Sequence, residues 1–292
     1  MAISAKQVKE LREKTGAGML DCKKALEACD GDQEKAFDWL REKGIAKAAK
    51  KASRIAAEGL STYVIEGNKC AVVEVNSETD FVAKNDEFKQ LVNFCAELCV
   101  KNDPADLTAA LALEAEEGKT LETYIAEKTG KIGEKLSFRR FVVLTKEDSD
   151  VFGAYSHGGK ITSVVVIANS EDEKAKNVAM QLASMKPNYM DKDSVPAEDL
   201  KREMDVQINI MKEDPKMATK PQNILEKIVA GKMGKFYKEN CLTEQAFIMD
   251  DSMSVQQYLG KGKVKEIVRF EVGEGMQKRE ENFAEEVAKQ MA

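Results

Sequence analysis

Histidine is almost absent from this 292-residue sequence, in which His157 is the only one. A catalytic triad built on histidine, or a metal site with several histidines, would have to use this residue. Aromatic residues are also sparse, at 6% with one Trp.

Apolar runs such as 141–144 and 164–168 fall far short of the roughly 18 residues that cross a bilayer. The N-terminal residues alternate charged and apolar side chains, a pattern that does not predict a leader. We therefore expect no membrane span and a cytoplasmic location.

The six cysteines form no C-x-x-C motif, and the sequence carries no sign of secretion. They are predicted to be reduced thiols. Cys95 and Cys99 lie four residues apart on a predicted helix and could share a metal. Without further ligands nearby, burial as small apolar side chains is the simpler interpretation. No Walker A, G-x-S-x-G or H-E-x-x-H motif occurs. We therefore expect no cofactor, no resident metal and no covalent catalysis.

Acidic residues outnumber basic ones by 51 to 45, which gives a net charge of -6. A dedicated nucleic-acid-binding protein would normally show a basic excess. The stretch 43–54 is basic, unlike the chain as a whole. Together with Arg41 it carries six Lys or Arg residues in an alanine-rich segment. It is predicted to be a solvated helical linker. A nucleic-acid contact is the alternative, although no aromatic residue is interleaved for base stacking.

The residues up to Gly44 predict three short helices. Ser4 opens a capping-box pattern before the first helix, and Asp32 is placed to cap the third, which Gly44 follows. The second helix is expected over 19–29, with Leu20 among the residues available for burial. Three helices of this length close around a small core, and a unit of this size is typically a binding module.

Two segments, 71–78 and 164–171, echo each other and both end in Asn-Ser-Glu. Each follows a turn-like tetrapeptide and precedes an amphipathic helix, expected around 88–100 and 175–185. Two further matches occur later in the chain: 120–125 with 254–259, and Arg140-Phe141 with Arg269-Phe270. Each half of the repeat therefore predicts a β-hairpin, a helix and a third strand.

The matched segments lie further apart in the second half of the repeat, which places an insertion there. Apolar residues recur at helical spacing on both sides of Pro215 and Pro221 and predict an antiparallel helical hairpin. Residues 282–291 predict a terminal amphipathic helix.

The loop at 77–86 carries an aromatic residue within a polar segment. One interpretation is a helix N-terminus in which Thr79 or Asp80 is the cap and Phe81 folds back as a hydrophobic staple. The other has Phe81 protruding into a pocket on another protein, with Asp80 placing negative charge near a cation site of that partner. The residues alone leave both open. His157, in a Tyr-Ser-His-Gly-Gly turn, is interpreted as an exposed turn residue or a partner contact and not as a general base.

Three motifs, 8–26, 78–85 and 269–275, resemble the bacterial elongation factor Ts family, in the family's order and from one end of the sequence to the other. The resemblance implies an α+β fold. Its parts are an N-terminal three-helix UBA-like domain, a core of two repeated strand-hairpin/helix subdomains with small antiparallel sheets, an inserted helical coiled-coil hairpin and a C-terminal helix. The expected boundaries are 1–56 for the UBA-like domain and linker, 57–146 for core subdomain N, 147–191 and 241–275 for the two parts of core subdomain C, 192–240 for the hairpin and 276–292 for the C-terminal helix.

The same resemblance implies a guanine-nucleotide exchange factor for the GTPase elongation factor Tu. Such a factor promotes GDP release by disturbing the magnesium site, which allows GTP to reload. The family motif assigns magnesium dislocation to Thr79, Asp80, Phe81 and Val82. It assigns partner contacts to Met19, Lys23, Ile132, Gly133 and His157.

No direct nucleic-acid binding is expected, and a homodimer or a heterotetramer with the GTPase is left open. Two rival functions are a scaffold that binds without accelerating nucleotide release and an RNA-binding factor that uses the 41–54 stretch. An enzyme that uses His157 is a more distant alternative.

Overall fold

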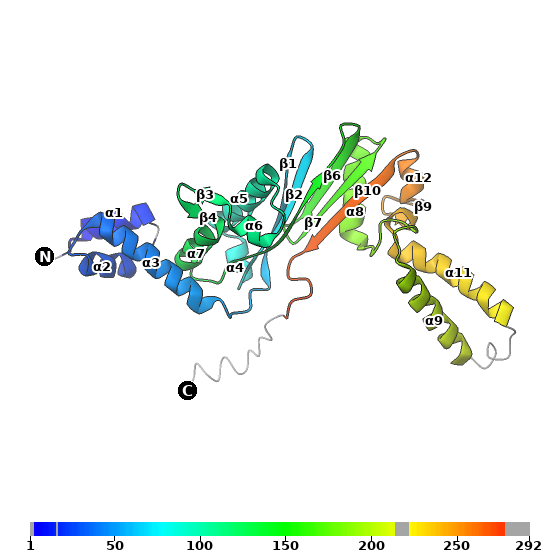
Figure 1. Ribbon diagram of the computed structural model, residues 1–292, viewed down its shortest axis with the longest axis horizontal. Helices are drawn as coiled ribbons and strands as arrows, with labels where there is room; N and C mark the ends of the chain where they lie inside the picture. Colours follow the sequence, from blue (N-terminus) through cyan, green and yellow to red (C-terminus); the bar gives the residue numbers. More distant parts are fainter. Residues whose placement is uncertain (1–2, 16, 214–221, 278–292) are drawn as a thin grey trace. The chain divides into compact units, whose positions relative to one another are not determined.

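The computed structural model describes residues 3–15, 17–213 and 222–277 (Figure 1). It is a mixture of helices and small antiparallel sheets, so the predicted α+β class is confirmed. Its contacts divide the chain into two units, one within 1–143, 158–160 and 270–292 and the other within 144–157 and 161–269. The helix predicted over 282–291 lies outside the described residues. Within the described ranges, none of the helices combines the length and the apolar character that crossing a bilayer requires.

The chain begins with three helices, α1 (Ala5–Thr15), α2 (Met19–Ala28) and α3 (Gln33–Lys51). The predicted caps are confirmed. Ser4 Oγ accepts a hydrogen bond from the Gln7 amide at 3.2 Å, while Gln7 Oε1 accepts one from the Ser4 amide at 3.0 Å. The Asp32 carboxylate accepts hydrogen bonds from two amides in the first turn of α3. The core of these helices consists of Val8, Leu11, Cys22, Ala25, Leu26 and Ala36.

Helix α3 does not end before Gly44, as the sequence pattern predicts, but continues without interruption to Lys51. The predicted helical linker is therefore the second half of the same helix. At this point α3 packs closely on helix α7 (Leu121–Ile132), where a Cβ added to Gly130 would lie 2.6 Å from Gly44 Cα. Glycine serves here as a close-contact residue and not as a helix terminator.

The first unit contains a three-stranded sheet in the order β1-β2-β5. Strands β1 (Glu58–Glu66) and β2 (Lys69–Ser77) form the predicted antiparallel hairpin, and β5 (Ser137–Thr145) is the predicted third strand. Between them the chain forms α4 (Asp80–Ala83), α5 (Asp86–Asn102), α6 (Leu107–Leu111), β3 (Glu114–Glu116), β4 (Lys119–Thr120) and α7.

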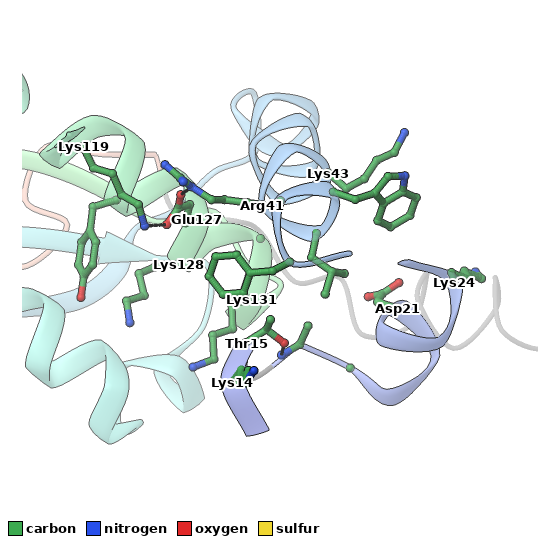
Figure 2. A pocket seen from close by; sticks show the side chains of 18 of the residues that line it. Lys14, Thr15, Asp21, Lys24, Arg41, Lys43, Lys119, Glu127, Lys128 and Lys131 are labelled. Carbon is green, nitrogen blue, oxygen red and sulfur yellow. Dashed lines mark hydrogen bonds and ion pairs between the residues drawn. The ribbon is translucent and has the colours of Figure 1, made fainter. Parts of the chain in front are cut away.

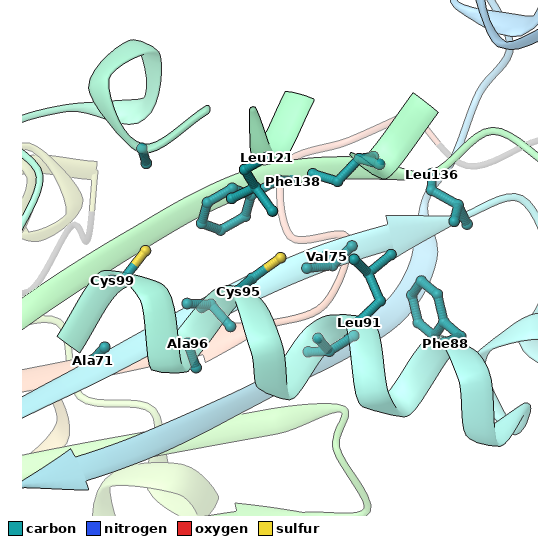
Figure 3. Close-up of a cluster of buried hydrophobic side chains, with 14 of the residues drawn as sticks. Ala71, Val75, Phe88, Leu91, Cys95, Ala96, Cys99, Leu121, Leu136 and Phe138 are labelled. Atoms are coloured by element: carbon teal, nitrogen blue, oxygen red, sulfur yellow. The ribbon is translucent and has the colours of Figure 1, made fainter. Parts of the chain in front are cut away.

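Helix α5 buries one face against the sheet (Figure 3). Phe88, Leu91, Cys95 and Cys99 recur at helical spacing on that face and are almost fully buried. Burial raises the pKa of the Cys99 thiol to about 12 and that of Cys95 further still. Both are therefore protonated at neutral pH and pack as small apolar side chains.

The second unit repeats this arrangement. Its sheet has the order β10-β7-β6, with the hairpin β6 (Asp150–His157) and β7 (Ile161–Ala168) and the third strand β10 (Lys263–Glu271). In both sheets the second hairpin strand is central and a long helix, α5 or α8 (Asp172–Met185), packs on it. A small hairpin of β8 (Ala246–Phe247) and β9 (Asp250–Ser254) precedes the short helix α12 (Val255–Leu259), as β3 and β4 precede α7. The predicted repeat is confirmed.

The insertion in the second unit consists of helices α9 (Ala197–Glu213) and α11 (Gln222–Asn240). They pack against each other through Met211, Val229 and Met233. The short 3-10 helix Leu242–Glu244 follows. The structure thus contains the two helices of the predicted hairpin; the residues that join them lie outside the described ranges.

Candidate functional site

The loop after strand β2 forms the one-turn helix α4. Thr79 is its N-cap: its Oγ1 accepts a hydrogen bond from the Val82 amide at 3.4 Å. Just before it, Ser77 Oγ donates a hydrogen bond to the Thr79 carbonyl at 2.9 Å. Of the two residues that the sequence offers as the cap, Thr79 has this role and Asp80 is the first residue of the helix.

Phe81 projects from this turn and is 78% exposed, more than any other large apolar side chain in the described part of the chain. The staple interpretation is therefore wrong. The next two residues take the place that a staple would fill: Val82 packs against the core of the first unit and Ala83 is buried. The turn thus anchors itself through its last residues and leaves the ring of Phe81 available for contact.

Asp80 lies beside Phe81 and pairs with Lys84, whose Nζ is 2.7 Å from Asp80 Oδ2. This hydrogen bond is the main reason that the pKa of Asp80 is below its ordinary value, and the charges of Lys84 and Lys160 act in the same direction. The Lys84 ammonium also lies 5.7 Å from the centre of the Phe81 ring. The surface of the turn therefore presents an ionised carboxylate next to an aromatic ring.

A second segment that the sequence singles out reaches this turn. Both Thr79 donors bind the carboxylate of Glu134: the amide lies 2.9 Å from Oε2, and Oγ1 lies 2.6 Å from Oε1. Glu134 follows Gly133, which ends helix α7 with a φ of +89°. The Thr79–Glu134 contact joins residues 55 positions apart, so no local pattern indicates it. Its effect is to fix the first residue of the Phe81 turn to the end of helix α7.

The neighbouring Glu78 adds a further attachment. Its Oε1 accepts a hydrogen bond from the Lys135 amide at 2.6 Å, and both of its carboxylate oxygens lie 3.3 Å from Arg54. Of the predicted contact residues next to Glu134, Ile132 packs partly into the core and Gly133 is exposed. The structure thus brings the 78–82 and 132–134 segments together in one surface region of the first unit.

The predicted contact residues of the N-terminal helices lie at the start of α2. Met19 is 56% exposed, and Lys23 is exposed with Glu27 at 3.7 Å. Leu20, which the helical spacing made available for burial, is instead 74% exposed. It begins the helix next to Met19, before the face that packs on α1 and α3. Two adjacent apolar residues at the start of a helix are the sequence signal that could have indicated the exposure of Leu20.

His157 belongs to the second unit, at the end of β6. It is exposed, and its Nδ1 lies 3.1 Å from the Tyr155 hydroxyl. The position agrees with the expected turn residue. Within the described residues, His157 therefore has a tyrosine neighbour on its own strand as its hydrogen-bond partner.

The basic stretch at 41–54 makes specific contacts with acidic and carbonyl groups of the first unit. Arg41 forms an ion pair with Glu127, the Lys51 ammonium binds the Gly133 carbonyl, and Arg54 binds Glu78. Arg41 and Lys51 are partly buried by these contacts, so the expectation of a solvated linker is wrong for them, whereas Arg54 stays exposed. They dock the second half of α3 on the core, which accounts for part of the basic pattern without a nucleic acid.

The site therefore consists of an exposed aromatic ring on a turn that hydrogen bonds hold in place. The comparison with known families gives the particular class. The family model described as Elongation factor TS matches residues 78–274, which include the Phe81 turn, α5 to α7 and the elements of the second unit through β10. The chain belongs to the elongation factor Ts family, whose members are nucleotide exchange factors of translation elongation and interact with elongation factor Tu.

Proposed function

We propose that this chain binds elongation factor Tu in its GDP form and promotes GDP release by disturbing the magnesium site of the bound nucleotide, so that GTP can reload. The observation that carries the proposal is the exposure of Phe81 on a turn fixed by Thr79 and Glu134. Magnesium bridges nucleotide phosphates to a GTPase. Displacing groups that hold the metal weakens GDP binding without breaking a covalent bond, so no catalytic group and no cofactor of this chain is required.

Phe81 would act as a wedge between elements of the partner. An aromatic side chain buries roughly 150–250 Å², which at about 25 cal/mol per Å² corresponds to about 4–6 kcal/mol before the costs of association. A mobile turn would lose part of this gain to ordering. The hydrogen bonds of Thr79 to Glu134 supply the order in advance, because they hold the turn before the partner arrives.

Asp80 would act on the metal by its charge. Its carboxylate is ionised and lies next to the wedge, so a magnesium ion nearby would meet a competing anion. Val82 supports the turn from the core side. The chain and GDP then bind the GTPase with negative coupling, and the coupling is reciprocal. High GDP concentrations would weaken the complex for the same reason that the complex releases GDP.

We further propose that the remaining predicted residues are docking contacts. Met19 and Lys23 would belong to a UBA-like module that binds the GTPase, Ile132 and Gly133 would contact it beside the wedge, and His157 would do so from the second unit. The domain boundaries expected from the sequence, a coiled-coil character of α9 and α11, a cytoplasmic location and an oligomer with the GTPase are parts of the same proposal.

The test is the release of a fluorescent GDP analogue from elongation factor Tu in excess unlabelled GDP. The chain should accelerate release in a concentration-dependent manner, and Phe81→Ala should slow the accelerated rate by about tenfold or more, as expected for a binding hot spot. Ile65→Ala is the matched control, because Ile65 is a 43% exposed apolar residue on β1 of the same unit. Binding without acceleration would favour the scaffold, and equal rates for Phe81→Ala and Ile65→Ala would remove the wedge.

A further inference from the structure

A hollow of 470 Å³ lies between the N-terminal helices and helix α7, within the first unit (Figure 2). One wall comes from α1, α2 and α3, and the other from α7 and the β3–β4 hairpin. Seven lysine and arginine side chains line it, against three carboxylates. The whole chain has a net charge of -6, so this hollow has the opposite sign from the chain average.

Ion pairs within the hollow do not cancel its positive charge. Glu127 binds both Arg41 and Lys119, and Lys119 also pairs with Glu116 at 3.0 Å. Lys128 and Lys131 likewise share a single oxygen of the neighbouring Glu87, at 2.7 and 2.8 Å. The walls therefore hold fewer negative groups than positive ones even where every cation has a partner.

Two further lysines of the hollow, Lys14 and Lys24, are exposed and make no ion pair with a carboxylate in the described ranges. Lys43 lies 5.4 Å from the centre of the Trp39 ring. Partial burial acts to lower the pKa of Lys128, but the hydrogen bond to Glu87 together with the charge of Glu87 and the interactions with Tyr124 outweighs it, so the pKa is raised.

Aromatic side chains line the same space. Phe37 is 39% exposed and Trp39 is partly buried, both on α3. The volume falls within the roughly 300–1,000 Å³ typical of small-molecule sites. A ligand that matches both features combines several negative charges with a planar ring. Phosphate groups supply the first and a nucleobase the second, since bases stack on aromatic side chains and phosphates bind lysine clusters.

We propose that this hollow binds a nucleoside polyphosphate, with its phosphates among the lysines of the two walls and its base against Phe37 and Trp39. The ligand would bridge α3 and α7 and hold the N-terminal helices on the core. A nucleic-acid strand fits less well, because the hollow is bounded and the chain as a whole is acidic. The site does not involve Phe81, so it stands apart from the proposed exchange function.

The single tryptophan of the chain, Trp39, lines the hollow and so reports on its occupancy. The full chain, purified and checked to be free of any GTPase, is titrated with GTP, ATP and inorganic pyrophosphate. Tryptophan fluorescence and calorimetry are recorded in parallel. We expect a saturable signal for at least one nucleotide and binding of pyrophosphate weaker by about tenfold or more, since pyrophosphate lacks the base. No elongation factor Tu is present, so failure here and failure of the exchange proposal are distinguishable.

Charge-reversal variants test whether the nucleotide binds in this hollow. Lys14→Glu and Lys24→Glu should each weaken nucleotide binding by about fivefold or more, because they reverse unpaired cations at the hollow. Lys101→Glu makes the same charge change at an exposed position on α5, outside the hollow, and should alter binding by less than about twofold. All three positions are exposed, so the fold should be retained, as circular dichroism can verify.

Four results would overturn the proposal. The first is the absence of a saturable signal in both measurements. The second is pyrophosphate binding as tight as that of the nucleotides, which would show that the base makes no contact. The third is displacement of the nucleotide by a much tighter RNA oligonucleotide, which would indicate a nucleic-acid site. The fourth is an equal loss in Lys24→Glu and Lys101→Glu, which would show a general charge effect.

Discussion

Gly44 and Gly130 lie against each other where helix α3 packs on helix α7. A Cβ atom added to Gly130 would lie 2.6 Å from Gly44 Cα and 2.9 Å from the Gly44 carbonyl oxygen. Both neighbours are backbone atoms, which cannot move aside as a flexible side chain can. The absence of a side chain at Gly130 therefore permits this close approach of the helices, and the ion pair of Arg41 with Glu127 also joins α3 to α7.

Gly130→Ala should weaken this helix contact. Alanine favours a helix over glycine by about 1 kcal/mol, but overpacking a close contact typically costs about 1–3 kcal/mol. We expect a net loss of free energy of unfolding of up to about 2 kcal/mol. Urea unfolding followed by Trp39 fluorescence measures it directly, because the only tryptophan lies on α3. A more stable variant would show that the helices are not in close contact.

Gly231→Ala is the matched control of opposite sign. Gly231 lies inside α11, and none of the residues that the structure describes comes within 4 Å of an added Cβ. The substitution should therefore stabilise the protein by about 0.5–1 kcal/mol through helix propensity alone. Urea unfolding followed by circular dichroism measures this change. Destabilisation would mean that α11 has a neighbour at this position.

Glu134→Gln should loosen the Phe81 turn. The glutamate accepts two hydrogen bonds from Thr79, whereas glutamine offers one acceptor oxygen and would direct its amide donor at another donor. Losing one bond to a charged acceptor costs about 1.5–3 kcal/mol. We expect faster amide exchange at Phe81 and Val82 and, if the exchange function holds, a lower maximal rate of GDP release with a smaller change in the half-saturating concentration.

Glu122→Gln is the control for this change. It makes the same substitution on the first turn of α7 at an exposed position. Amide exchange at Phe81 and GDP release should both stay at the values of the unmodified chain. Unaltered exchange in Glu134→Gln as well would show that Glu134 does not hold the turn.

Local sequence patterns predicted much of the fold because the corresponding structures are local. Asp32 caps α3 through amides two and three residues away, and the β1–β2 turn closes within its own hairpin. The repeat was visible because the same short signals recur in the same order. The long-range contacts were not predictable in this way: Glu134 reaches Thr79, and Gly44 meets Gly130, only after the chain has folded.

In the candidate site, too, local features could be predicted from the sequence and features that depend on tertiary packing could not. The cap at Thr79 was one of two local options, and the structure selected it. The sequence could not show whether Phe81 packs inward, because that depends on which residues occupy the core beneath the turn. In the structure Val82 and Ala83 pack there. Leu20 is exposed for a similar reason, since α2 already packs through Cys22, Ala25 and Leu26. Periodicity identifies apolar residues, but tertiary packing decides which of them are buried.

The fully buried Glu74 connects β2 to the segment after β10, which lies in the family-like motif 269–275. Its carboxylate accepts hydrogen bonds from Arg139 at 2.9 Å, Arg140 at 2.6 Å and the Gly273 amide at 2.9 Å. Burial acts to raise the pKa of Glu74, but these hydrogen bonds outweigh it and the pKa is lowered. A carboxyl group whose pKa is lowered by folding stabilises the fold at pH values above its ordinary pKa of 4.5. This stabilisation is lost as the pH falls through the pKa of Glu74 in the folded protein.

Glu74→Gln should therefore destabilise the fold at neutral pH and flatten its acid dependence. Removing one partner of a buried ion pair costs about 3–5 kcal/mol, because the arginines keep their charge without a counter-charge. Urea unfolding between pH 3 and 7 measures both the loss of free energy of unfolding at neutral pH and its dependence on pH. Glu66→Gln, at the exposed end of β1, should leave the pH profile unchanged. Parallel profiles for Glu74→Gln and the unmodified chain would show that Glu74 does not carry this stabilisation.

Asp80→Asn tests whether charge at the Phe81 turn acts on the partner's magnesium, and Asp86→Asn is a closely matched control. Asp80 pairs with Lys84 at 2.7 Å and Asp86 pairs with Lys89 at 2.8 Å, and the hydrogen bond to lysine is the main cause of the lowered pKa in both. Exposed pairs of this kind contribute little to stability, so the two variants should unfold alike.

The two variants should differ only in GDP release. We expect Asp80→Asn to slow the release stimulated by the chain by about threefold to tenfold, or about 0.7–1.4 kcal/mol, while Asp86→Asn leaves it unchanged. Because the pKa of Asp80 lies below 3.8, its charge is constant from pH 5 to 8, and the ratio of the two rates should not vary over that range. The difference should also shrink as free magnesium is removed, since the carboxylate then has no metal to displace. Equal slowing in both variants would assign the effect to general surface charge, and a difference that persists without magnesium would assign it to contact with the protein partner and not to the metal.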